Sequence, residues 1–585
     1  MKYNKVTRYW KPLLSLVFGI AAFTFWRWDY PFALTYHEQF QLFLFDSDYL
    51  VSHLTQPGGW ACYIGEFLVQ FYNNVTAGAA ILASIFVAMQ ALTWLLAKKQ
   101  NRDLSDAYYL LSFLPPVILW IAMGDENVMA AFMVAILLQQ ALLLLLPNST
   151  VWRILFCFIG IPLCYWLLGP AVLILAVYAG MVPLPDNTSK WKQAGLCVGT
   201  ILYTVGCIAA SALVANYPLA QLFYGIYYYR LPDIFPYLTL LIGLATALLP
   251  FVLKRLPSVQ GKKAVYSNAG TSIVLFLSFL LSKPLMYDDK KYDLIEYDYL
   301  ARQEKWDEII MKSEQKSPDL PMSVSMTNLA LGMTNQLGDR LFEFFQNGGE
   351  GLVPHFERNH FTALTSSEIF YHLGLTNTAM RFAFEAQEAI PNYNKSVRCM
   401  KRLAETNMIN GQYAVARKYL RLLQKTLCYS KWADYMMTLI NNPQQIDQHP
   451  EYGYMRSCHL DQDFLYSDSE VDKMLGQLFL KNKKNALAMQ YMAVYPLLER
   501  DLDKLMLYLP YVENYEVYNP KAIQEGVAMA CMTKHQQPPQ GFIDQMTQQN
   551  FQNFAQTYAQ QGKNVANMQA FRNTFWYYMM QAKQD

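Results

Sequence analysis

Long apolar runs fill the first half of this 585-residue chain, from Pro12 to about Tyr287. A helix needs roughly 20 residues to cross a hydrocarbon core about 30 Å thick. The runs that approach or reach that length are residues 12–28, 75–97, 107–123, 127–146, 152–168, 170–184, 194–215, 236–253 and 268–286. The sequence therefore predicts an all-α, polytopic transmembrane bundle of about nine spans, with the run at 170–184 the shortest.

Lysine and arginine gather at alternate ends of these runs. Basic residues lie before the first run and again at residues 98–102, 153, 190–192 and 254–263. Residues 28–97 contain no lysine or arginine. Cytoplasmic loops of membrane proteins carry an excess of Lys and Arg. We therefore expect an inner (plasma) membrane protein with a retained signal-anchor and a cytoplasmic N-terminus. Nine spans then place the C-terminal half in the periplasm. A re-entrant hairpin at 170–184 would instead place the C-terminal half in the cytoplasm.

The composition changes after residue 286, where charged residues become frequent and no apolar run is long enough to span. Apolar residues recur there with the helical period of 3.6, which indicates a helical domain. We expect two domains, a transmembrane domain over 1–286 with an outer acidic loop at 29–73, and a soluble domain over 287–585. The formal net charge of +2 gives no reason to expect a nucleic-acid partner.

Two similar segments occur 37 residues apart in the second domain. They read LGLTNTAMRFAFEAQEAIP around Gly374 and NGQYAVARKYLRLL around Gly411, with looser copies at 299–318, 485–500 and 552–566. The pattern of a turn glycine, an aromatic residue and small helix residues resembles the tetratricopeptide repeat. That resemblance implies a solenoid whose groove binds a protein partner. The alternative is a helical cap on the membrane domain.

Acidic residues mark the connections on the side opposite the basic clusters. The first connection holds Glu38, Asp46, Asp48 and Glu66, and the pair Asp125–Glu126 occupies the next tight turn. Charged groups near hydrocarbon are costly and tend to mark a substrate or ion path. These acids are therefore the candidate functional residues.

An inward N-terminus, an early acid in the first outer connection, a second outer acidic site and an outer C-terminal domain together resemble polytopic GT-C-type glycosyltransferases. That resemblance implies sugar transfer from a polyprenyl-phosphate donor outside the cytoplasm. It implies Glu38 as the first candidate for the catalytic base, with Asp125 or Glu126 the second. His37-Glu38 stands where that family often has an Asp-Glu pair.

The remaining candidates would bind the donor or a metal on the same interpretation. Asp46 and Asp48 would hold a divalent cation such as Mg²⁺ or Mn²⁺, because carboxylates suit hard cations. The residues assigned to the substrate are Arg230, Tyr229, Glu66 and Lys283. The cations among them would contact the phosphate of the lipid donor.

Each of these residues also has a structural interpretation. Asp46 and Asp48 fit a solvated loop or helix cap, and Asp125–Glu126 fit the first turn of the next helix, where acids favour the helix dipole. Glu66 fits the wet face of an interfacial helix. Tyr229 fits the aromatic belt, and Arg230 fits an interfacial anchor.

Two functions therefore stay open for this chain. One is a membrane glycosyltransferase whose helical domain docks an acceptor or partner, and the other is a non-enzymatic membrane scaffold for envelope assembly. Transport ranks third, because no clear inverted repeat is visible. The sequence holds no phosphate-binding loop, no nucleophile elbow and no zinc-binding H-E-x-x-H motif.

Overall fold

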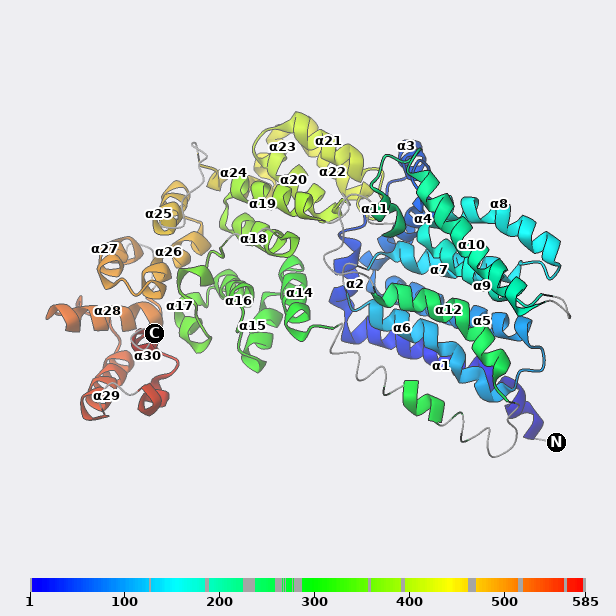
Figure 1. Cartoon of the computed structure of the whole chain (residues 1–585). Coiled ribbons are helices and arrows are strands. Elements are labelled where there is room, and N and C mark those ends of the chain that lie inside the picture. Colours follow the sequence, from blue (N-terminus) through cyan, green and yellow to red (C-terminus); the bar gives the residue numbers. More distant parts are fainter. Residues whose placement is uncertain are drawn as a thin grey trace. The chain divides into compact units, whose positions relative to one another are not determined.

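The computed structural model is helical throughout the residues that it describes, and no strand occurs among them (Figure 1). The structure describes residues 3–125, 128–184, 189–224, 237–257, 266, 268, 270–275, 277, 287–355, 359–390, 395–460, 470–513, 519–561 and 565–581. The chain divides into two compact units. Unit 1 comprises Met1–Asp293, Ile390–Val397 and Leu422–Lys431, and unit 2 comprises Leu294–Ala389, Arg398–Arg421 and Trp432–Asp585.

Unit 1 is a bundle of helices joined by short turns. Its helices are α1 (Tyr3–Thr24), η1 (Phe25–Asp29), α2 (Pro31–Glu38), α3 (Ser47–Leu54), α4 (Gly59–Val69), η2 (Gln70–Asn73), α5 (Val75–Gln100), η3 (Asp106–Phe113), α6 (Leu114–Ala122), α7 (Ala130–Leu144), α8 (Thr150–Leu168), η4 (Gly169–Ala171), α9 (Val172–Met181), α10 (Lys190–Ser211), α11 (Leu219–Tyr224) and α12 (Tyr237–Arg255).

Four apolar helical stretches in the described residues are long enough to cross a membrane, fewer than the nine spans expected. They are Tyr9–Asp29, Val75–Gln100, Thr150–Met181 and Lys190–Ser211. The runs expected at 152–168 and 170–184 join through η4 into one stretch, and the run at 107–123 begins as a 3₁₀-helix. Helix α7 has 15 residues and so extends only about 22 Å, short of the hydrocarbon thickness. Most of 268–286 lies outside the described residues.

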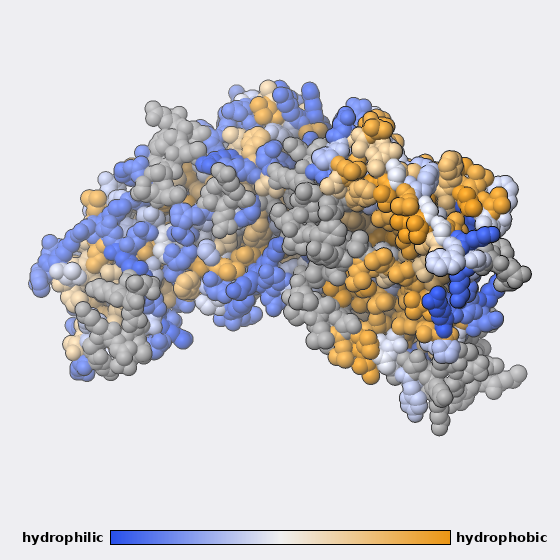
Figure 2. Space-filling model, viewed as in Figure 1, coloured by the Kyte–Doolittle hydropathy of each residue, from blue (hydrophilic) through white to orange (hydrophobic). Residues whose placement is uncertain are grey.

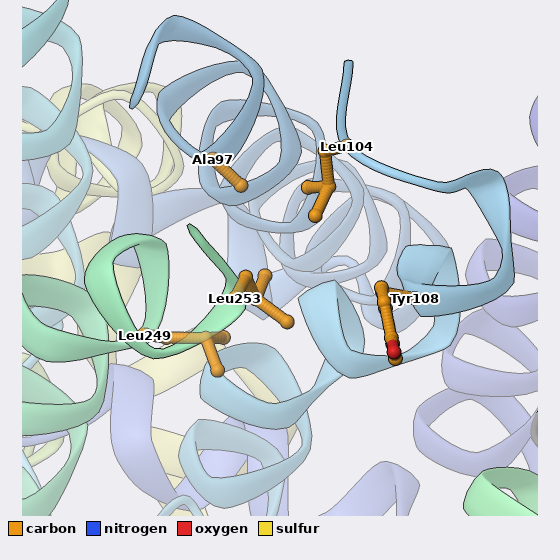
Figure 3. Close-up of a cluster of buried hydrophobic side chains, with 5 residues drawn as sticks. All are labelled: Ala97, Leu104, Tyr108, Leu249 and Leu253. Atoms are coloured by element: carbon orange, nitrogen blue, oxygen red, sulfur yellow. The ribbon is translucent and has the colours of Figure 1, made fainter. Parts of the chain in front are cut away.

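Contacts within unit 1 sort the helix ends into two groups. At one end, Lys11 pairs with Asp106 at 2.5 Å, and the Lys99 ammonium donates to the Leu144 carbonyl at 2.8 Å. We call this the basic end, defined by Lys11, Lys98, Lys99 and Arg153. Figure 3 shows part of its core, where Ala97, Leu104, Tyr108, Leu249 and Leu253 pack together.

The opposite end joins the other termini of the same helices. The Tyr287 hydroxyl donates to the Trp120 carbonyl at 2.9 Å, and its ring packs edge-on against Phe25. The Gly58 amide donates to the Trp166 carbonyl at 2.8 Å, which fixes α4 against the end of α8. We call this the acidic end, defined by Glu38, Glu66 and Asp125. Unit 1 therefore has two ends, one marked by Lys11, Lys98, Lys99 and Arg153 and the other by Glu38, Glu66 and Asp125.

Two short segments from the second half of the sequence belong to unit 1. The amide of Leu42 donates to the Lys395 carbonyl at 3.1 Å, and the amide of Phe45 donates to the Lys425 carbonyl at 2.7 Å. The extended stretch after α2 is thus held between residues 395 and 425. Packing thus assigns two segments beyond residue 286 to the first unit. The expected domain boundary at residue 286 stays a prediction.

Unit 2 is an array of antiparallel helices. Beyond α14 (Asp289–Arg302), which the division between units crosses, they are α15 (Trp306–Gln315), α16 (Pro321–Met333), α17 (Leu337–Arg340), α18 (His360–Leu373), α19 (Thr376–Ala389), α20 (Val397–Ile409), α21 (Tyr413–Leu423), α22 (Ser430–Asn441), α23 (Pro443–Gln448), α24 (Pro450–Cys458), α25 (Val471–Lys481), α26 (Ala486–Leu498), α27 (Leu502–Glu513), α28 (Lys521–Lys534), α29 (Gln545–Gln561) and α30 (Phe575–Gln581). Helix α26 is buried from Leu487 to Leu498 and forms the core.

Glycines stand at the turns of the two central hairpins, as the repeat pattern predicts. Gly374 separates α18 from α19 with φ +92°, and Gly411 separates α20 from α21 with φ +75°. A residue with a Cβ is strained in this left-handed conformation. The helical hairpins are therefore present, while their assignment to the tetratricopeptide repeat stays a prediction.

The surfaces of the two units differ in polarity. Figure 2 shows broad hydrophobic areas over unit 1 and a mainly hydrophilic surface over unit 2. Exposed apolar side chains on unit 1 include Trp152, Phe158 and Leu202, each more than half exposed. Large exposed apolar surfaces mark contact with another apolar phase. This surface is compatible with helices that cross a membrane.

Candidate functional site at the acidic end

Helix α2 carries the first two candidate residues into the interior of unit 1. Pro31 occupies its first turn, where the fixed φ of proline favours helix initiation. Every residue from Phe32 to Leu44 is buried, including the ionisable pair His37 and Glu38. The expected acid of the first connection therefore lies inside the fold at the acidic end.

His37 is a buried, neutral histidine. Its side chain is 2% exposed. Burial lowers the pKa of His37 to about 4, against a smaller upward effect of the Asp125 charge and the Met123 backbone. At neutral pH the ring is uncharged and presents one proton acceptor.

Glu38 is 3% exposed and contacts the segment Leu422–Lys431. The Tyr429 hydroxyl lies 3.4 Å from both carboxylate oxygens of Glu38, and it accepts a hydrogen bond from the Asn73 amide at 2.8 Å. Cys428 is adjacent, and burial followed by the Glu38 charge raises the pKa of its thiol. Glu38 is thus a buried carboxylate held by a tyrosine that lies 391 residues away in the sequence.

Glu66 forms a second buried polar group on α4. The Tyr49 hydroxyl and the His53 ring both contact its Oε2 atom, with His53 Nε2 at 2.8 Å. Burial lowers the pKa of His53, but the hydrogen bond to Glu66 and the Glu66 charge outweigh it, so the pKa is raised. Glu66 is 6% exposed and does not face water, contrary to the interfacial-helix interpretation.

Asp46 and Asp48 flank the start of α3. Asp46 holds the N-cap position without a capping hydrogen bond and pairs instead with Lys425 at 2.6 Å. That hydrogen bond from the Lys425 ammonium holds the pKa of Asp46 below its usual value. Asp48 is exposed in the first turn. The part of the chain that the structure describes holds no group of three or more His, Cys, Asp or Glu side chains placed to hold a metal ion.

Asp125 lies in the turn after α6, five residues before α7 begins at Ala130. It is therefore not in the first turn of the next helix, and its charge instead acts on His37. The charge of Asp125 thus acts on the residue that precedes Glu38 on α2. The remaining candidates Glu126, Tyr229, Arg230 and Lys283 lie outside the described residues.

Two features of the site were missed from sequence. Tyr49 and His53 share one face of α3 at a spacing of four, a detectable signal for two groups that meet one acid. Tyr429 and Lys425 carry no such signal, because only the folded chain brings them to Glu38 and Asp46.

Two buried polar atoms of this region, the Tyr72 hydroxyl and the Gln70 Oε1 atom, lack a protein partner among the described residues. Helix η2, which carries Gln70 and Tyr72, packs directly on α2. Buried polar groups are normally satisfied, so such atoms indicate a place for water or a polar ligand. The arrangement offers one carboxylate base, Glu38, beside a neutral imidazole.

Comparison with known proteins gives a family without an assigned activity. A model described as a family of unknown function (DUF6057) matches residues 5–582, nearly the whole chain. No curated protein and no solved structure matches it.

Proposed function

We propose a function for this chain, which belongs to the DUF6057 family of unknown function, from the buried carboxylate of Glu38. The chain transfers a glycosyl group from a polyprenyl-phosphate donor to a hydroxyl acceptor at the acidic end of unit 1. The observation that carries the proposal is a carboxylate 3% exposed, close to the end of the first candidate span. Burial of a charge at such a place is costly and is usually retained for function.

The chemistry needs one base. The Glu38 carboxylate takes the proton of the acceptor hydroxyl while the acceptor oxygen bonds to the anomeric carbon. The bond from that carbon to the phosphate oxygen breaks, and polyprenyl phosphate leaves with the electron pair. General-base assistance of this kind contributes roughly 10²–10⁴-fold to a rate. His37, neutral at pH 7, is placed to accept a hydrogen bond from the acceptor or from water.

The site is closed as described, because Phe32–Leu44 are all buried. The segment Leu422–Lys431 contacts Glu38 through Tyr429 and is fastened at its exposed side by the Lys425–Asp46 ion pair. Exposed ion pairs contribute little, about 0–1 kcal/mol. Release of this segment, which also requires the backbone hydrogen bond from Phe45 to Lys425 to break, is the movement that would admit an acceptor.

Orientation belongs to the same proposal. The opposite charges of the two ends support a cytoplasmic basic end and an acidic end outside the cytoplasm. An odd number of passes from a cytoplasmic N-terminus would then place unit 2 in the periplasm. The Mg²⁺ or Mn²⁺ proposed for Asp46 and Asp48 would need further ligands from the donor phosphate or water.

Substitution at the base tests the enzyme directly. Glu38→Gln keeps the size of the side chain but removes the proton acceptor, and Asp125→Asn tests the second candidate. Asp29→Asn is the matched control, because Asp29 is an exposed acid at the same end. In cells that depend on the chain, Glu38→Gln should lose at least about 100-fold of the glycan product while Asp29→Asn retains it. Unchanged glycans in Glu38→Gln at normal protein level would refute the enzyme.

The scaffold remains a second candidate function, favoured by one observation. Glu66 and Asp46 are both bound by side chains of this chain, His53 and Lys425, as expected of structural groups. On this reading the helical hairpins of unit 2 bind an envelope protein. Full complementation by Glu38→Gln, together with loss of a co-purified partner on substitutions in unit 2, would support the scaffold.

A further inference from the structure

A cavity of about 240 Å³ lies between α8, α9 and α10 in unit 1. Its lining is apolar apart from one arginine, a threonine and a tyrosine. The residues that line it are Arg153, Ile154, Cys157, Phe158, Ile161, Ala179, Gly195, Leu196, Gly199, Thr200 and Tyr203. The cavity is remote in sequence from α2 and shares no residue with the site at the acidic end.

Arg153 is a buried cation at this cavity. The residue is 1% exposed, and its Nη1 atom donates to the Val182 carbonyl at 2.8 Å. Its Nε and Nη2 atoms have no hydrogen-bond partner among the described residues. Nor does any described carboxylate form an ion pair with it. A buried guanidinium without an anion is costly, which points to a missing anionic partner.

The cavity has a polar end and an apolar length. Arg153 lies in the first turn of α8, at the basic end, and exposed Lys190 and Lys192 begin α10 nearby in the fold. From there the lining follows α8 to Ile161 and α10 to Tyr203. At the far part, the Tyr203 hydroxyl donates to the Phe158 carbonyl at 2.9 Å and links α10 to α8.

The outer surface around the cavity is apolar and exposed. Ile154 is 50% exposed, Val198 is 55% exposed and Leu202 is 63% exposed. The helices α8 and α10 are both within candidate membrane spans. Such side chains face lipid acyl chains in a bilayer, so the cavity is accessible to lipid from the membrane.

We propose that this cavity binds one anionic phospholipid. The Nε and Nη2 atoms of Arg153 donate to two oxygens of the lipid phosphate, a pairing that the planar guanidinium favours. One acyl chain lies along the apolar lining between α8 and α10. The basic end attracts this headgroup, because anionic leaflets attract nearby Lys and Arg. The site is independent of the function proposed for Glu38.

Glycines on α10 provide a direct way to fill the cavity. A Cβ built on Gly195 or Gly199 meets no atom within 4 Å, so the first carbon of a side chain there clashes with no protein group. Gly206 is equally open on the same helix but does not line the cavity. Gly199→Leu therefore blocks the lipid site, and Gly206→Leu is its matched control. Leucine also favours the helix over glycine by about 1 kcal/mol, so neither change should prevent folding.

The test measures lipid retention by the purified full chain. Native mass spectrometry counts bound phosphatidylglycerol after exchange from mixed phosphatidylglycerol and phosphatidylcholine micelles. Wild type and Gly206→Leu should each retain one phosphatidylglycerol, whereas Gly199→Leu and Arg153→Gln should retain at least fivefold less. Phosphatidylglycerol should also raise the melting temperature of wild type more than phosphatidylcholine does, and this difference should vanish in both variants.

Three outcomes would overturn the proposal. Equal retention by Gly199→Leu and Gly206→Leu would show that lipid binds elsewhere, even if Arg153→Gln failed to fold. Equal retention of the two lipids by wild type would remove the role of headgroup charge. Displacement of phosphatidylglycerol by millimolar inorganic phosphate alone would assign Arg153 to a free anion instead of a lipid.

Discussion

At the residue scale, the acidic end of unit 1 holds ionisable side chains that the fold removes from water. His37 and Glu38 are adjacent on α2, yet their surroundings differ, because His37 faces Asp125 and Glu38 faces Tyr429. The sequence placed Glu38, Glu66 and Asp125 on one side of the bundle through the absence of nearby cations. It could not indicate burial or partners, because Tyr429 and Lys425 come from a distant segment.

His37 makes folding stability depend on pH. Its pKa is about 4 when folded and 6.5 when free, so protonation favours the unfolded chain. The stabilisation is complete above pH 6.5 and is lost as the pH falls toward 4. By pH 5 the loss is roughly 2 kcal/mol. Thermal unfolding of the full chain in detergent at pH 7.5 and pH 5 measures it.

His37→Gln supplies the control for that effect. This variant cannot take up the proton, so its melting temperature should fall less between pH 7.5 and pH 5 than that of wild type. An identical pH response in the two proteins would show that His37 titrates normally in the fold.

At the element scale, helices of unit 2 are joined by a buried charge network that no sequence pattern revealed. Arg398 binds Asp298 of α14 at 2.7 Å, and Arg402 binds Glu368 of α18 at 2.9 Å. Burial raises the pKa of Glu368, but the charges of Arg402 and Arg398 and the hydrogen bond from His372 outweigh it and hold the pKa well below its usual value. The helical period of the sequence predicted these helices. It could not predict which helices pack together, because the ion pairs that join them link residues 34 to 100 positions apart.

Removal of one cation from this network should be strongly destabilising. Arg402→Met leaves Glu368 and Glu405 buried without their main partner, which costs about 3–5 kcal/mol. Arg381→Met removes a more exposed pair with Glu385 on α19 and should cost under about 1 kcal/mol. Melting temperatures of the two variants compare these effects. An equal fall in melting temperature in the two variants would mean that the buried network stabilises the fold no more than an exposed ion pair does.

At the scale of the whole molecule, the near-neutral net charge is a sum over separated charges. Cations gather at one end of unit 1, and Glu38, Glu66 and Asp125 gather at the other. The basic clusters in the sequence led us to expect such a separation, and the side of the membrane on which each end lies stays a prediction. The apolar runs did not predict the number of long helices, because short helices such as α7 and joined ones such as α8 and α9 have the same composition as full spans.

Cysteine labelling tests the proposed orientation. Ser47 at the acidic end and Ser189 at the basic end are both exposed. In a Cys428→Ser background, a membrane-impermeant maleimide should label Ser47→Cys in intact spheroplasts and Ser189→Cys only after lysis. The opposite labelling pattern would place the acidic end in the cytoplasm. That result would contradict the proposal that the lipid donor binds there from outside the cytoplasm.

Consumption of a lipid-linked sugar by the purified chain tests the proposed glycosyl transfer. Proteoliposomes holding wild type, Glu38→Gln or Asp29→Asn receive a panel of radiolabelled polyprenyl-phosphate sugars with an envelope acceptor fraction, and released polyprenyl phosphate is counted. Wild type and Asp29→Asn should consume at least one donor, and Glu38→Gln should do so at least about 100-fold more slowly. Consumption by Glu38→Gln at the wild-type rate, or none by wild type, would contradict the assignment of Glu38 as the base of a glycosyl transfer.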